Sequence, residues 1–150
     1  MDIVGKHDMN AWYQLINAAK AQCGYDFAEG LDHYLVLTLN AFLQDTGIAN
    51  NVLALAYLEN MRQQASHLSA RNLRHVGDQC LLISGLFPER AQKRNVSLEY
   101  YVDMGKNCYL QLANASPHLK LNNGLFYELG IHFVGLMDIL NTLRNSQSPH

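Results

Sequence analysis

The chain has 150 residues, of which 49% are hydrophobic and 16% are charged, so it is long enough for one domain with a full core. Its net charge of −2 lacks the basic excess that binding to nucleic acid or to an anionic membrane normally requires. No uncharged apolar run approaches the roughly 20 residues of a membrane helix, and the opening MDIVGKHDMN does not resemble a signal peptide. We therefore expect a cytoplasmic protein with no membrane span.

The cysteine and charge contents bear on the compartment and on partners. Cys23, Cys80 and Cys108 share no CxxC spacing, which predicts reduced core thiols. The charged fraction lies below the roughly 25% usual for soluble domains. A surface with so few charges is either partly covered by another subunit, which favours a homo-oligomer such as a dimer, or simply rich in Asn, Gln and Ser.

We expect no cofactor.

The first half of the chain contains three predicted helices. An apolar stripe predicts a helix over residues 9–22 that ends before Gly24. The second follows Asp26 and covers 27–43. Because it is apolar nearly all the way round, it should be central in its bundle. A third apolar stripe covers residues 48–58.

Three further helices are predicted in the second half. Residues 67–86 begin polar, become wholly apolar and end before Pro88, which cannot continue a helix. Ser97 is typical of an N-cap, and the helix after it, 98–112, is clearly amphipathic. The last predicted helix covers residues 123–144.

These elements predict an all-α fold, because the alternation typical of strands is missing. We expect a compact bundle of about six helices. It should form a single domain over residues 1–145, followed by a disordered tail at 146–150.

One candidate for buried chemistry lies where the fourth predicted helix turns from polar to apolar. Arg71, His75 and Asp78 recur there at helical spacing, and a flanking carboxylate and guanidinium orient an imidazole as a general base requires. No nucleophile belongs to this group, because Ser84 and Cys80 should face elsewhere. The alternative interpretation is a solvated face on which an arginine pairs with the aspartate.

Two Glu-x-x-x-His spacings suggest a second kind of site. Glu29 with His33, and Glu128 with His132, each place a carboxylate and an imidazole on one helix face. If the two helices were neighbours, the four side chains would resemble the carboxylate–histidine sites of di-metal bundles, although those use a Glu-x-x-His spacing. Ordinary surface pairs are the alternative, and we favour no metal.

A basic turn after Pro88 is a third candidate. Residues 61–94 contain six Lys or Arg against two acids, and the turn precedes a helix N-terminus, where the dipole favours anions. A solvated corner is the alternative. The residues that we expect to meet a partner are Arg71, His75, Asp78, Arg90, Lys93, Arg94, Asp103 and Lys106.

Aromatic residues on the last two predicted helices suggest either core packing or a cavity for a small apolar ligand. They are Tyr100, Tyr101, Tyr109, Phe126, Tyr127 and Phe133. Gly124, Gly130 and Gly135 would allow a close helix crossing or a dimer seam.

The run GLFPER at 85–90, followed by YYVDMGK at 100–106, resembles segments of small bacterial all-helical proteins to which no function is attached. The resemblance implies a helical fold and no activity. From the residues themselves, the first hypothesis is a protein-interaction or regulatory module and not an enzyme. The alternatives are a metal-dependent helical-bundle enzyme and a sensor of a small apolar ligand.

Overall fold

The computed structural model describes residues 9–27, 29–45, 69–89 and 97–147. In these ranges the chain is all helical and has no strands, which confirms the predicted fold class. The helices are α1 (Met9–Cys23), α2 (Glu29–Asp45), α4 (Ala70–Leu86), α6 (Leu98–Ala113), α7 (Asn123–Ile131) and α8 (Phe133–Gln147), with a short 3-10 helix, η3 (Pro117–Leu119). The predicted helix at 48–58 lies outside the described residues.

Local sequence signals set most of these boundaries. α1 is followed directly by Gly24, whose φ of 80° suits a residue without a Cβ atom. The hydroxyl oxygens of Ser69 and Ser97 accept hydrogen bonds from backbone N–H groups in the first turns of α4 and α6, as expected of N-caps. At the other end of α4, Arg144 Nη1 donates to the carbonyl oxygen of Leu86 at 2.9 Å.

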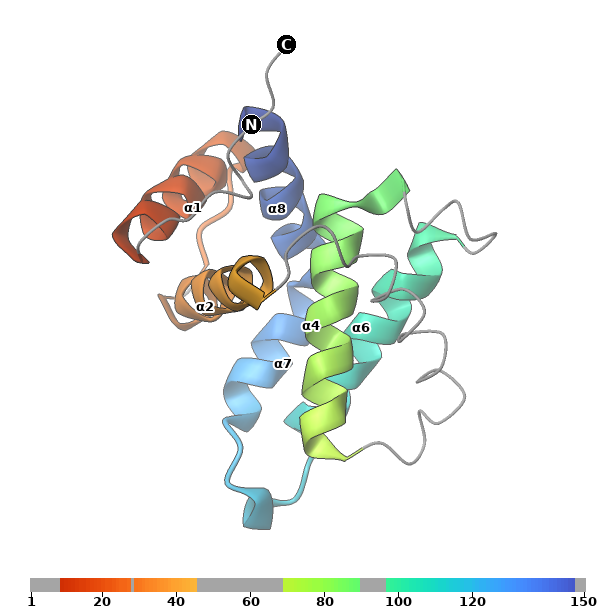
Figure 1. Cartoon of the computed structure of the whole chain (residues 1–150). Helices are drawn as coiled ribbons and strands as arrows, with labels where there is room; N and C mark the ends of the chain where they lie inside the picture. Colours follow the sequence, from red (N-terminus) through yellow and green to blue (C-terminus); the bar gives the residue numbers. More distant parts are fainter. Residues whose placement is uncertain (1–8, 28, 46–68, 90–96, 148–150) are drawn as a thin grey trace.

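A single buried cluster of apolar side chains draws on all six α-helices of the described residues. α4 packs against both α6 and α8, and α4 and α6 run side by side in opposite directions (Figure 1). α2 packs mainly against α1 and α7, and its Leu37 is 43% exposed. The prediction that the second helix is the central one is therefore wrong, because α4 holds that position among the described helices.

The last predicted helix is divided at His132, which separates α7 from α8. Its φ and ψ of −102° and 15° lie outside the helical minimum. The apolar spacing continues across this residue, which explains why the sequence predicts one unbroken helix. α8 also reaches Gln147, so residues 146 and 147 are helical and do not belong to the predicted tail.

No helix in the described parts of the chain combines the length and the apolar character needed to cross a membrane.

Candidate functional site

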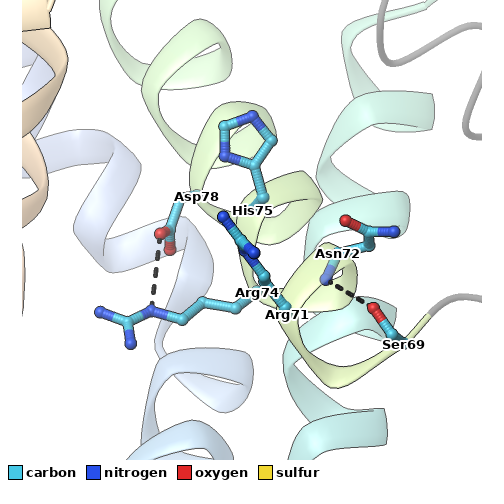
Figure 2. A pocket seen from close by; sticks show the side chains of 6 residues that line it. All are labelled: Ser69, Arg71, Asn72, Arg74, His75 and Asp78. Carbon is cyan, nitrogen blue, oxygen red and sulfur yellow. Dashed lines mark hydrogen bonds and ion pairs between the residues drawn. The ribbon is translucent and has the colours of Figure 1, made fainter.

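The exposed N-terminal half of α4 borders an open hollow of about 750 Å³, which we call the α4 hollow. The described residues that line it all come from α4 and its N-cap, and Figure 2 shows their side chains: Ser69, Arg71, Asn72, Arg74, His75 and Asp78. The structure thus brings together three of the predicted partner-binding residues. It adds three that the prediction did not include.

Asp78 lies at the inner edge of the hollow, where its side chain is 18% exposed. Its Oδ1 accepts hydrogen bonds from the hydroxyls of Tyr34 at 2.6 Å and Tyr109 at 2.7 Å. These lengths are those of strong bonds to a charged acceptor. One carboxylate oxygen of Asp78 therefore links α4 to α2 through Tyr34 and to α6 through Tyr109.

Arg74 forms the outer side of this cluster. Its Nε lies 3.9 Å from Asp78 Oδ2 and donates to the Tyr34 hydroxyl at 3.1 Å, while its guanidinium lies 5.2 Å from the centre of the Tyr34 ring, within cation–π range. The side chain nonetheless remains 56% exposed, so part of its positive charge faces solvent.

Burial controls protonation in this cluster. Removal from water raises the pKa of Asp78, although the hydrogen bonds from Tyr34 and Tyr109 and the charge of Arg74 oppose that rise. Burial, reinforced by the neighbouring carboxylate, raises the pKa of both tyrosines well above its usual range. Both hydroxyls therefore keep their protons and act as donors at neutral pH.

The cluster depends on a close approach of α4 to α6. A Cβ atom at Gly77 would lie only 2.8 Å from the Tyr109 ring, so the absence of a side chain there allows the ring to pass across α4. Tyr109 is fully buried, and its ring stacks on Phe126 with centroids 6.2 Å apart. The ring of Tyr109 is thus packed between Gly77 and Phe126, which fixes the position of its hydroxyl beside Asp78.

Arg71 and His75 are exposed on the same face of α4, one turn apart. In Figure 2 they project beside each other while Arg74 reaches sideways to Asp78. The expected pairing of an arginine with the aspartate is confirmed in Arg74. Ser84 and Cys80 are buried in the other half of the helix, and burial raises the pKa of the Cys80 thiol, which leaves it a poor nucleophile.

Two further predicted partner-binding residues, Asp103 and Lys106, are described and do not line the hollow. Arg90, Lys93 and Arg94 lie outside the described residues. Asp103 and Lys106 lie on α6, where the adjacent Gly105 packs on Cys80. Since Tyr109 meets Asp78 and the helices are antiparallel, these two residues stand level with the second half of α4, away from the hollow.

Of the two Glu-x-x-x-His spacings, only Glu128 and His132 are described in full, and they form a local pair. His132 Nε2 lies 3.4 Å from Glu128 Oε1, and both side chains are about 40% exposed. His33 Nδ1 is hydrogen-bonded to the Tyr13 hydroxyl, and the side chain of Glu29 lies outside the description. Within the described part of the chain, no three His, Cys, Asp or Glu side chains come together to hold a metal ion.

The predicted aromatic cavity is filled by its own rings in the described core. Tyr101, Tyr109, Phe126 and Phe133 are buried there, and the Tyr109 and Phe133 ring centroids are 6.0 Å apart. Tyr127 is 51% exposed and faces solvent, contrary to its expected place inside. Core packing therefore describes these aromatic residues better than a ligand pocket.

Apolar spacing does not single out the two tyrosines that hold Asp78. Tyr34 and Tyr109 lie on apolar helix faces and look like ordinary core residues. The available signal was chemical, because a buried tyrosine hydroxyl needs a partner and Asp78 is an acid at the point where α4 enters the core.

Comparison of the chain with protein-family models, curated proteins and solved structures found no match.

Proposed function

We propose that this protein is an interaction module that binds an acidic segment of a partner protein at the α4 hollow. The observation that carries the proposal is the inward orientation of Asp78, whose Oδ1 is occupied by the hydroxyls of Tyr34 and Tyr109. Asp78 is hydrogen-bonded to side chains of the core, while Arg71 and Arg74 remain at the surface.

The charge of the hollow supports an acidic ligand. Arg71 is exposed and Arg74 is more than half exposed, so two guanidinium groups stand at the hollow against a single, mostly buried carboxylate. Arginine recognises carboxylates through paired N–H donors. The helix dipole of α4 also supports an acidic ligand, because its positive N-terminal end favours negative charge.

The shape supports a segment of a protein and not an enclosed small molecule. The hollow is wide and open, and the six lining residues that the structure describes lie within three turns of one helix and its cap. Ligand sites for small molecules are usually deep and mostly apolar, whereas polar protein contacts are shallow and solvated. We place the interaction in the cytoplasm, since all three cysteines are free thiols.

Binding of a fluorescein-labelled hexaglutamate peptide, followed by fluorescence anisotropy, tests the proposal. We expect the wild-type protein to bind this peptide with an affinity that falls as salt is raised, and to ignore hexalysine. Arg71→Glu should weaken binding roughly tenfold or more, because it replaces an attraction by a repulsion.

The control is Gln14→Glu, which adds one negative charge at an exposed position of α1, away from the hollow. It should bind as the wild type does. The proposal fails if hexaglutamate does not bind, or if Arg71→Glu and Gln14→Glu bind equally well.

A further inference from the structure

The side chain of Arg74 is held in place by Tyr34, which lies on a different helix. Arg74 Nε donates a hydrogen bond to the Tyr34 hydroxyl at 3.1 Å, and the guanidinium lies 5.2 Å from the centre of the Tyr34 ring. An exposed arginine normally samples many rotamers. Here two contacts with one tyrosine restrain the guanidinium, although the arginine side chain is 56% exposed.

The direction of the hydrogen bonds explains why Tyr34 contacts both Asp78 and Arg74. A tyrosine hydroxyl has one proton and donates one hydrogen bond, and this proton goes to Asp78 Oδ1, 2.6 Å away. The lone pairs of the hydroxyl oxygen are therefore left for Arg74 Nε. Asp78 Oδ2 lies 3.9 Å from that Nε, which is too far for a hydrogen bond, so Tyr34 mediates the contact between the acid and the arginine.

Tyr34 is itself fixed by the core. Its residue is 5% exposed, and its ring makes edge-to-face contacts with the rings of Tyr109 and Phe126, at centroid distances of 6.4 and 6.1 Å. This arrangement is one that aromatic rings favour. Because Tyr34 lies on α2 and its two neighbours lie on α6 and α7, the support beneath Arg74 depends on the packing of several helices.

The contact through Nε leaves the forked end of Arg74 available. Within the described part of the chain, neither Nη atom of Arg74 has a hydrogen-bond partner. In Figure 2 the dashed line joins Nε to Asp78, and the forked end projects away from this acid. Two parallel N–H donors of this kind match the two oxygen atoms of a carboxylate.

We infer that Tyr34 is a positioning residue of the α4 hollow, and that the two Nη atoms of Arg74 bind one side-chain carboxylate of the acidic segment. The inference rests on the proposed function and deepens it, because it names the group that prepares the site for its ligand. Since Tyr34 holds the guanidinium before the ligand arrives, binding costs less conformational freedom.

Removal of single hydroxyls tests this role. Tyr34→Phe keeps the ring under the guanidinium and removes the hydrogen bond to Nε, so we expect the Kd for hexaglutamate, measured by fluorescence anisotropy, to rise roughly three- to tenfold. The comparison variant is Tyr109→Phe, which also removes a hydroxyl from Asp78 Oδ1 but no hydrogen bond from Arg74. It should raise the Kd less than Tyr34→Phe does.

A double-mutant cycle separates positioning from a general loosening of the fold. In the Arg74→Met background, Tyr34→Phe should have no further effect on the Kd, because the group that Tyr34 positions is gone. If the hydroxyl acted only on the packing of α2 against α4, it would change the Kd by the same factor in both backgrounds.

The Nε–Hε signal of Arg74 in the ¹⁵N-labelled protein reports the positioning without any ligand. Its loss in Arg74→Met assigns it. We expect slow exchange of this proton with solvent in the wild type and in Tyr109→Phe, and rapid exchange in Tyr34→Phe. Thermal unfolding followed by circular dichroism shows whether each variant is folded, and the signal of the wild type remains a test if Tyr34→Phe unfolds.

The results that contradict the inference differ from those that contradict the proposed function. Equal binding of hexaglutamate by the wild type and Tyr34→Phe, equal losses in the two tyrosine variants, or equal losses in the two backgrounds would each overturn the inference alone. Rapid exchange of the Arg74 Nε proton in the wild type would do the same. The absence of any binding by the wild type would overturn the proposed function and the inference with it.

Discussion

The first half of α4, from Ala70 to Asp78, leaves most of its polar side chains in contact with solvent, whereas the second half, from Cys80 to Leu86, is buried at every residue. Both halves belong to one helix, with the same backbone and the same neighbour in α6. Asp78 stands at the boundary between them. The difference shows how a helix that enters a core can keep a charged surface, because the acid at the boundary is held inward by tyrosines and its cationic neighbours are left outside.

The largest expected effect is in the buried half. Ile83 is fully buried, so Ile83→Ala should lower the free energy of unfolding by about 3 kcal/mol through lost burial and a residual cavity. Urea unfolding measures this directly. A loss below about 1 kcal/mol would mean that the second half of α4 is not tightly packed.

A smaller effect is expected at the boundary. Asp78→Ala removes the acceptor shared by Tyr34 and Tyr109 and should cost about 2 kcal/mol, since two buried hydroxyls lose their partner. Asp78→Asn keeps an oxygen acceptor and should cost less than about 1 kcal/mol. Equal losses in the two variants, measured by urea unfolding, would contradict the role assigned to the hydrogen bonds.

The pH dependence of the free energy of unfolding tests the role of Asp78 at the boundary between the two halves of α4. Because the pKa of Asp78 is raised in the folded state, the folded protein binds the proton more tightly than the unfolded chain. Stability from this group is fully present below its unfolded pKa and is lost as the pH rises through the folded value. The wild type should therefore gain stability relative to Asp78→Asn as the pH falls from neutral towards about 4, and a relative loss would contradict the raised pKa.

The smallest effect on stability is expected in the exposed half. Arg71→Ala should change the free energy of unfolding by no more than about 0.5 kcal/mol, because its side chain is exposed. Thermal and urea unfolding check this. A loss comparable to that of Asp78→Ala would make Arg71 a structural residue and would remove the distinction between the two halves.

Helix existence and many boundaries are predictable from local chemistry. Ser97 and Gly24 act at the ends of helices as predicted, and the buried segment from Cys80 to Phe87 follows from its apolar run. The start of α4 was predicted wrongly, because its N-cap Ser69 lies inside the predicted helix of residues 67–86. The break at His132 is not predictable from apolar spacing, because the same stripe continues on both sides of it.

The candidate site is predictable only in part. Arg71, His75 and Asp78 follow from their spacing on one helix. The partners of Asp78 do not, because Tyr34 is 44 residues away and Tyr109 is 31 residues away, and periodicity within one helix carries no information about which neighbours will meet it. Long-range hydrogen bonds of this kind depend on how the helices pack.

The most direct test of the division of α4 into a binding half and a packing half is a titration of the ¹⁵N-labelled protein with hexaglutamate, followed by NMR. We predict that the largest amide shift changes fall between Ser69 and Asp78, and that they disappear in Arg71→Glu. Shift changes centred on another helix, or unchanged in Arg71→Glu, would contradict the assignment of the α4 hollow as the binding surface.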